Sequence, residues 1–244
     1  MNYIKVFKFR SVNDYLFASL ARSEIYFANP EALNDPYDCQ VDLAQALARA
    51  IELTSGAQRT ALESADQRQP ILQEISKQLR TFGVCSFSLS PMNQLLWSHY
   101  ANKHCGVCIL YTIPESYVRD EDNGIFGMSA VDYGDSPLTS FFLNYDFSGG
   151  DAHFSALAQE AIKKALTVKS SDWCYEQEVR MIRQQSSTMA VPSEFLTNIC
   201  FGLRTPVPER TKIRQLVEAT YEGVIFTELR HGKSDFGLEI HQIY

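Results

Sequence analysis

Several segments of the chain alternate between apolar and polar residues, which is the pattern of a half-buried β-strand. In residues 3–10, Lys8 and Arg10 share one face while Phe7 and Phe9 share the other. Residues 106–112 are instead apolar throughout, which predicts a central strand. Further strands are predicted at residues 24–28, 83–89, 125–133, 176–183, 199–203, 223–229 and 236–243.

Apolar residues three or four positions apart predict helices elsewhere in the chain. One helix is expected at residues 11–21 with Ser11 as its N-cap, and another begins near Pro91 and runs to about Ala101. Residues 138–150 are aromatic and end in glycine, so we expect a loop there. Two further helices are predicted at residues 152–168 and 208–220.

Residues 40–80 differ from the rest because they are rich in Ala, Gln, Leu and charge. Helical spacing of apolar residues around Leu47 and again around Ile71 and Ile75, with a polar break near Gly56, predicts two helices joined by a linker. We therefore expect a single α+β domain over residues 1–244, with mixed or antiparallel sheets of about nine strands and a helical insert at about 40–80. Since no G-x-G-x-x-G or P-loop follows a strand, a doubly wound parallel sheet is not expected.

Composition and charge narrow the classes of function. The 244 residues are 45% hydrophobic and carry a net charge of −7, which excludes a disordered chain and argues against a dedicated nucleic-acid packaging protein. No apolar run is long enough to span a bilayer, and no secretory signal is visible, so we expect a cytoplasmic protein with no membrane partner. The six cysteines are scattered and are expected to be free thiols, with no metal site.

Three of the predicted strands carry polar side chains on one face and apolar side chains on the other. A strand repeats every two residues, so the carboxylates of Glu176 and Glu178 are expected on one face, with Cα atoms roughly 7 Å apart. If the strands adjoin, a guanidinium, two hydroxyls and two carboxylates meet on one surface, whereas separate strands would leave these groups as ordinary solvated positions. The polar residues are Lys8 and Arg10, Ser86 and Ser88, and Glu176, Glu178 and Arg180.

Several short motifs are spread over most of the chain. They are Phe7-Lys8-Phe9-Arg10, Ile25-Tyr26-Phe27-Ala28-Asn29-Pro30, Asn34-Asp35-Pro36-Tyr37-Asp38, Cys85-Ser86-Phe87-Ser88, Trp97-Ser98-His99-Tyr100-Ala101 with His104 and Gly106, and Trp173-Cys174-Tyr175-Glu176-Gln177-Glu178-Val179-Arg180. With these motifs the chain resembles a widespread bacterial family, the domain-of-unknown-function 2971 family, and this resemblance implies no established activity.

The order Arg, Ser-x-Ser and Glu-x-Glu along the chain also resembles the arginine–serine–glutamate class of ADP-ribosyltransferases, although Phe87 stands where that pattern usually has Thr. This resemblance implies an ADP-ribosyltransferase-like fold and NAD as a substrate. Glu178 would stabilise positive charge on the ribose, and Glu176 would position or deprotonate the acceptor. The residues expected to bind NAD are Arg10, which would hold the pyrophosphate, and Ser86, Ser88, Tyr26, Tyr100 and His99.

We therefore expect an enzyme that transfers ADP-ribose from NAD to a macromolecular acceptor, either a protein or a nucleic acid. A toxin or phage-defence effector would fit this description, with an antitoxin or a second copy of the chain as a further partner.

Two alternatives remain open. The first is a hydrolase or phosphodiesterase centred on His99, with His104, Asp35 and Glu178 lining its pocket. The second is a non-catalytic module that binds a nucleotide or RNA through an anion site, with aromatic side chains for stacking. Its anion site would be formed by Arg10, Arg180 and Arg183.

Overall fold

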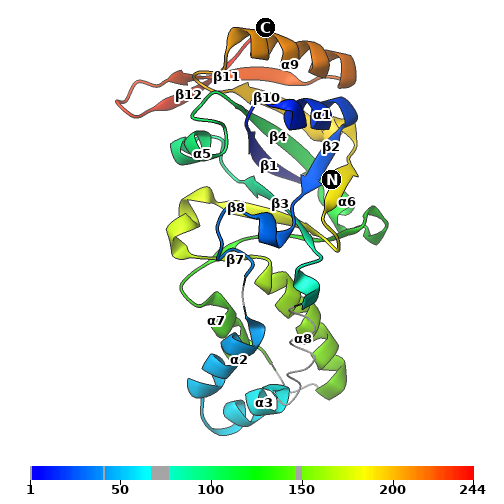
Figure 1. Cartoon of the computed structure of the whole chain (residues 1–244), viewed down its shortest axis with the longest axis vertical. Helices are drawn as coiled ribbons and strands as arrows, with labels where there is room; N and C mark the ends of the chain where they lie inside the picture. Colours follow the sequence, from blue (N-terminus) through cyan, green and yellow to red (C-terminus); the bar gives the residue numbers. More distant parts are fainter. Residues whose placement is uncertain (1, 41, 67–76, 147–149) are drawn as a thin grey trace.

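A large mixed sheet dominates the protein, which confirms the predicted α+β class (Figure 1). The computed structural model describes residues 2–40, 42–66, 77–146 and 150–244. The sheet has eight strands in the order β12-β11-β10-β4-β1-β3-β8-β5, and all neighbours are antiparallel except β10 and β11. Its strands are β1 (Tyr3–Arg10), β3 (Gly83–Ser88), β4 (Val107–Pro114), β5 (Ile125–Ala130), β8 (Glu178–Arg183), β10 (Leu196–Phe201), β11 (Ile225–His231) and β12 (Leu238–Gln242).

Smaller elements surround this sheet. Two-stranded sheets pair β2 (Glu24–Phe27) with β9 (Ser187–Ala190), and β6 (Asp132–Tyr133) with β7 (Val168–Lys169). The α-helices are α1 (Asp14–Arg22), α2 (Leu43–Glu52), α3 (Gly56–Asp66), α5 (Gln94–His99), α6 (Glu115–Arg119), α7 (Pro137–Asn144), α8 (Gly150–Ala165) and α9 (Val207–Thr220). Short 3₁₀ turns are η1 (Pro30–Ala32), η2 (Glu121–Asn123), η3 (Ser171–Glu176) and η4 (Ser193–Phe195).

The strand β4 lies in the middle of the sheet, between β1 and β10, as its apolar sequence predicts. Val107, Ile109 and Ile113 are buried in the main core, which also includes side chains of α1 and α9. This core extends across the sheet, since it also includes Phe87 of β3 and Met181 of β8.

The sheet parts between β1 and β3. These strands pair at one position only, Phe7 opposite Ser88, whereas β1 pairs with β4 along all eight of its residues. Beyond that point β3 bonds to the chain that follows β2, because Ala28 and Val84 exchange both backbone hydrogen bonds at 2.8 Å. The segment that follows β2 therefore lies beside β3, where β1 no longer pairs with it.

The helices α2, α3, α7 and α8 form a separate group at the other end of the molecule (Figure 1). Leu43, Leu47 and Phe142 lie in a second core with side chains of α8 and with Val84 and Ile182 of the sheet. The helix predicted around Leu47 is present as α2, whereas α3 begins at Gly56, where a polar break was expected; Ile71 and Ile75 lie outside the described residues.

Some predictions of local structure are wrong. Residues 137–144 form α7 instead of a loop, with Leu138 and Phe142 buried, because tertiary packing favours a helix there. Asn13, rather than Ser11, caps α1 by accepting a hydrogen bond from the Leu16 N–H. The helix expected from Pro91 begins only at α5, after an Asn93 cap.

Among the helices in the described ranges, none combines the length and the apolar character that crossing a bilayer requires.

Candidate functional site

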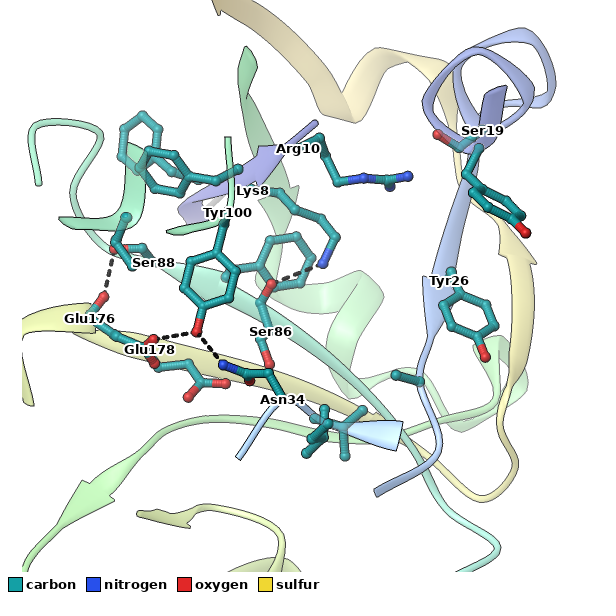
Figure 2. Close-up of a pocket in the computed structure, with 18 of the residues that line it drawn as sticks. Lys8, Arg10, Ser19, Tyr26, Asn34, Ser86, Ser88, Tyr100, Glu176 and Glu178 are labelled. Carbon is teal, nitrogen blue, oxygen red and sulfur yellow. Dashed lines mark hydrogen bonds between the residues drawn. The ribbon is translucent and has the colours of Figure 1, made fainter. Parts of the chain in front are cut away.

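A cavity of about 850 Å³ opens where β1 and β3 diverge. Its walls are formed by β1, β3, α1, β2 and α5, together with the loop around Asn34 and the acidic residues next to β8 (Figure 2). The volume lies within the range of pockets that hold drug-sized ligands and cofactors. The parting of the sheet therefore creates the space for a candidate site.

The cavity brings together most of the site residues predicted from the sequence. The strands β1, β3 and β8 are consecutive in the sheet, so the condition that the polar strands adjoin is met. The predicted residues that line the cavity are Arg10, Tyr26, Ser86, Ser88, Tyr100, Glu176 and Glu178. His99 is the exception, because its exposed side chain lies at the end of α5 and does not line the cavity.

One wall of the cavity is cationic. Lys8, Arg10 and Arg22 line it, and the Lys8 Nζ donates to the Ser86 carbonyl oxygen at 3.0 Å, across the gap between β1 and β3. Within the described part of the chain, none of these three side chains has a carboxylate partner, and neither guanidinium makes a hydrogen bond. Because positive groups gathered in a cavity without acidic partners favour anions, this wall suits a phosphate-bearing ligand.

The opposite end of the cavity is acidic and tightly hydrogen-bonded. Glu176 accepts from the Tyr100 hydroxyl at 2.7 Å and from the Lys169 Nζ at 2.6 Å. The same Nζ lies 3.2 Å from a carboxylate oxygen of Glu178, so one ammonium bridges the two carboxylates. The Tyr100 hydroxyl also accepts from the Asn34 amide at 3.1 Å, as Figure 2 shows.

Behind Glu178 lies a fully buried guanidinium. Arg180 donates to both carboxylate oxygens of Glu178, at 2.7 and 3.0 Å, and to Asp38 at 2.6 Å. It also donates to the Leu166 carbonyl oxygen at 2.9 Å. The buried ion cluster, defined as Asp38, Lys169, Glu176, Glu178 and Arg180, thus contains three acids and two bases.

These neighbours determine the protonation of the cluster. Burial alone would raise the pKa of Glu178, but the charges of Arg180 and Lys169 outweigh it and lower the pKa to about 2. Burial would lower the pKa of Lys169, but Glu178 and Glu176 reverse the effect and raise it. Burial and the hydrogen bond to Glu176 raise the pKa of Tyr100. Glu178 is therefore ionised, and Lys169 and Tyr100 are protonated, throughout the physiological pH range.

The two carboxylates differ in how much bonding capacity they have left. A carboxylate offers about four acceptor positions. Glu178 uses three of them for Arg180 and Lys169, while Glu176 uses two, for Tyr100 and Lys169. Glu176 is therefore the carboxylate better able to accept a hydrogen bond from a ligand.

The local geometry of Glu176 differs from the prediction. It belongs to the 3₁₀ turn η3, and Gln177 has a left-handed φ of 46°, so β8 begins only at Glu178. The two carboxylates are therefore not successive positions on one strand face. They converge instead because both bind Lys169.

Several residues of the site were not found by sequence reasoning. Lys169 follows an apolar run, and nothing in its neighbourhood indicates that it meets two glutamates. Asp38 and Asn34 belong to a motif that carries the family resemblance, but that resemblance assigns them no role in a site. Arg22, at the end of α1, lies one residue beyond the helix predicted at residues 11–21, and no pattern indicates that it lines a cavity.

The hydrolase alternative is not supported by the positions of its residues. Neither His99 nor His104 lines the cavity. Asp35 also does not line the cavity, and it accepts from the Tyr37 N–H at 3.0 Å. Within residues that the structure describes, no group of histidine, cysteine and acidic side chains is arranged to hold a metal ion.

The structure does not bring together the three arginines of the predicted anion site. Arg180 is buried among acids, and Arg183 donates to the Ser187 hydroxyl at 3.0 Å and lies over the Phe27 ring. Of these three arginines, only Arg10 lines the cavity, where Lys8 and Arg22 are its cationic neighbours.

All six cysteines are free thiols, as the sequence predicts.

Comparison with known proteins gives one match. No curated protein and no solved structure matches the chain, so nothing in the comparisons supports the resemblance to ADP-ribosyltransferases. Residues 96–181 match the model of a family described as "Protein of unknown function (DUF2971)", which confirms the first resemblance over the segment from α5 to β8.

Proposed function

We propose that the cavity binds NAD and that the protein transfers ADP-ribose from it to a protein or nucleic-acid acceptor. The observation that carries this proposal is the arrangement of charge. Cations on β1 and α1, with no carboxylate partner in the described part of the chain, line the same cavity as Glu176 and the ionised Glu178. A dinucleotide needs both, because its pyrophosphate is anionic and its nicotinamide riboside is cationic. The ADP-ribosyltransferase-like assignment of the fold belongs to the same proposal.

The cationic wall would hold the pyrophosphate. Arg10 presents a guanidinium with no competing partner in the described part of the chain, and a guanidinium donates two parallel hydrogen bonds to a phosphate. Lys8 and Arg22 would add positive charge on either side. The exposed ring of Tyr26 and the half-buried ring of Tyr100 offer faces for the planar groups of the ligand.

The acidic end would act on the glycosidic bond. When the bond between ribose C1′ and the nicotinamide nitrogen breaks, its electron pair leaves with nicotinamide and the ribose becomes an oxocarbenium ion. Glu178 would stabilise this positive charge electrostatically, while Glu176 would accept a hydrogen bond from a ribose hydroxyl or from the acceptor. The acceptor nucleophile then bonds to C1′ and loses its proton to solvent.

A second candidate is a nucleotide-binding module without chemistry. It is favoured by the bonding of the two carboxylates, because Lys169 bridges them and Arg180 occupies both oxygens of Glu178. In this case the cluster would only shape the cavity, and the ligand would bind without turnover.

Incubation with NAD labelled on its adenosine part, together with cell lysate, tests the proposal. We expect label on macromolecules with the native protein and none with Glu176→Gln or Glu178→Gln. Because Glu178→Gln disturbs Arg180, its fold is verified by circular dichroism. Arg10→Gln breaks no side-chain hydrogen bond or ion pair among the described residues and should raise the KM for NAD about tenfold or more, as expected for loss of a charged hydrogen bond.

The matched control is Arg119→Gln, which changes an exposed arginine of α6 and should leave transfer unchanged. A rise in melting temperature with NAD but no label transfer would establish the binding module instead. Absence of both NAD binding and transfer would overturn the proposal.

A further inference from the structure

A second cavity, of about 430 Å³, lies beside the loop that follows α5. Its lining is basic and is contributed by three separate parts of the chain. The residues are Ser98, Lys103, His104, Leu203, Arg204 and His231. None of these is acidic, in a chain whose net charge is −7.

The backbone that carries Lys103 and His104 is strained. Asn102, Lys103 and His104 have successive φ values of 47°, 55° and 69°, all in the left-handed region that such residues rarely adopt. Backbone strain of this kind is unfavourable and concentrates at sites of function. Contacts with the rest of the protein must therefore hold this turn in a conformation that its backbone does not favour.

Close packing holds this turn against the loop that carries Arg204. The Arg204 N–H donates to the His104 carbonyl oxygen at 2.9 Å, and the Gly202 N–H donates to the Gly106 carbonyl oxygen at 3.0 Å. A methyl group on Gly202 would lie only 2.2 Å from the His104 carbonyl oxygen. Only glycine permits this approach, which brings the two basic loops together.

The basic side chains have no protein partner. Over the described residues, the side chains of Lys103, Arg204 and His231 make no hydrogen bond or ion pair. His104 stacks on Trp97 and reaches the Ser98 hydroxyl only at 3.5 Å, and its Nδ1 is buried without a hydrogen-bond partner. Burial and the nearby Arg204 lower the pKa of His104. The side chains of Lys103 and Arg204 thus lie at the cavity without an acidic partner among the described residues.

We propose that this second cavity is a binding site for a small phosphate anion, such as inorganic phosphate or pyrophosphate. The guanidinium of Arg204 and the ammonium of Lys103 would bind its oxygens, with the Ser98 hydroxyl as a neutral donor. The site is separate from the first cavity and does not depend on the function proposed for it. The two sites share one segment, because Leu96 and Tyr100 line the first cavity while Ser98, Lys103 and His104 line the second.

Titration of the full-length protein with pyrophosphate tests this site, with the imidazole NMR signals of His104 and His231 as local reporters. His104→Gln and His231→Gln assign the two signals. We expect both signals to move with saturation. Arg204→Gln should weaken this response about tenfold or more, since it removes a charged donor.

Two matched variants separate this site from the first cavity. Arg10→Gln should leave the response intact although it removes a cation from the first cavity, and Arg59→Gln, in the distant helix α3, should also have no effect. Signals that stay in place as pyrophosphate is added, or that respond equally in Arg204→Gln, would overturn the proposal. A parallel titration with sodium chloride at the same ionic strength should not move them, and an equal response there would also overturn it.

Discussion

Replacement of Arg180 by methionine tests the energetics of the buried ion cluster. Methionine has a similar length but no charge, so Arg180→Met would leave Asp38 and Glu178 facing only Lys169, at 3.4 and 3.2 Å. Removing one partner from a buried ion pair costs about 3–5 kcal/mol. The pKa of Glu178 gives a similar figure, because lowering it from 4.5 to about 2 corresponds to about 3 kcal/mol at neutral pH.

Urea unfolding followed by circular dichroism measures this loss. A group whose pKa is lowered by folding stabilises the protein above its unfolded pKa, and the stabilisation disappears as the pH falls through its folded pKa. The native protein should therefore lose about 3 kcal/mol between about pH 5 and pH 2 from Glu178 alone. Arg180→Met should show a smaller loss, because only Lys169 of the two bases remains to lower the pKa of Glu178.

The control is Arg59→Met, which breaks an exposed pair between Arg59 and Glu63. Exposed pairs contribute only about 0–1 kcal/mol, so this variant should unfold almost like the native protein. If Arg180→Met were equally stable, or if it kept the full acid dependence, the reasoning on the ion cluster would be refuted.

Three further predictions concern packing and reactivity. Gly202→Ala should lower stability by about 1–3 kcal/mol, since its methyl group meets the His104 carbonyl oxygen, and an unchanged melting temperature would contradict this. Tyr100→Phe removes a donor from a buried carboxylate and should cost about 1–3 kcal/mol in urea unfolding, whereas a native midpoint would argue against the bond. Burial raises the pKa of Cys39 to about 12, so a thiol reagent at about pH 8 should modify the exposed Cys174 first, as peptide mass spectrometry would show; equal labelling of both would refute the assignment.

Local patterns were sufficient where one face of an element is buried and the other is not. The strand β1 occupies the predicted residues, Tyr3–Arg10, because its alternation is regular and β4 pairs with it along its whole length. The segment around Glu176 shows the limit of this reasoning. The alternation of polar and apolar residues predicts a strand from Glu176, but the left-handed backbone of Gln177 prevents the strand from beginning before Glu178. The two carboxylates still meet because both bind Lys169, which lies outside this segment.

The candidate site depended on contacts that local patterns do not encode. The adjacency of β1, β3 and β8 was a condition for the predicted site, and it is met. Lys169 comes from a two-residue strand, and Asp38 comes from a loop far from it in the chain. Their pairing is set by how the helical group packs on the sheet, so no period or motif in either segment indicates it.

The parting of the sheet has a mechanical consequence. One continuous set of ladders joins β12 to β1, another joins β3 to β5, and a single paired position connects the two sets. When the width of the cavity changes, the two sets of strands can therefore rotate relative to each other about this position, with little loss of backbone hydrogen bonds within either set. Ligands of different width would alter the angle between the two sets of strands and leave the strand pairing within each set intact.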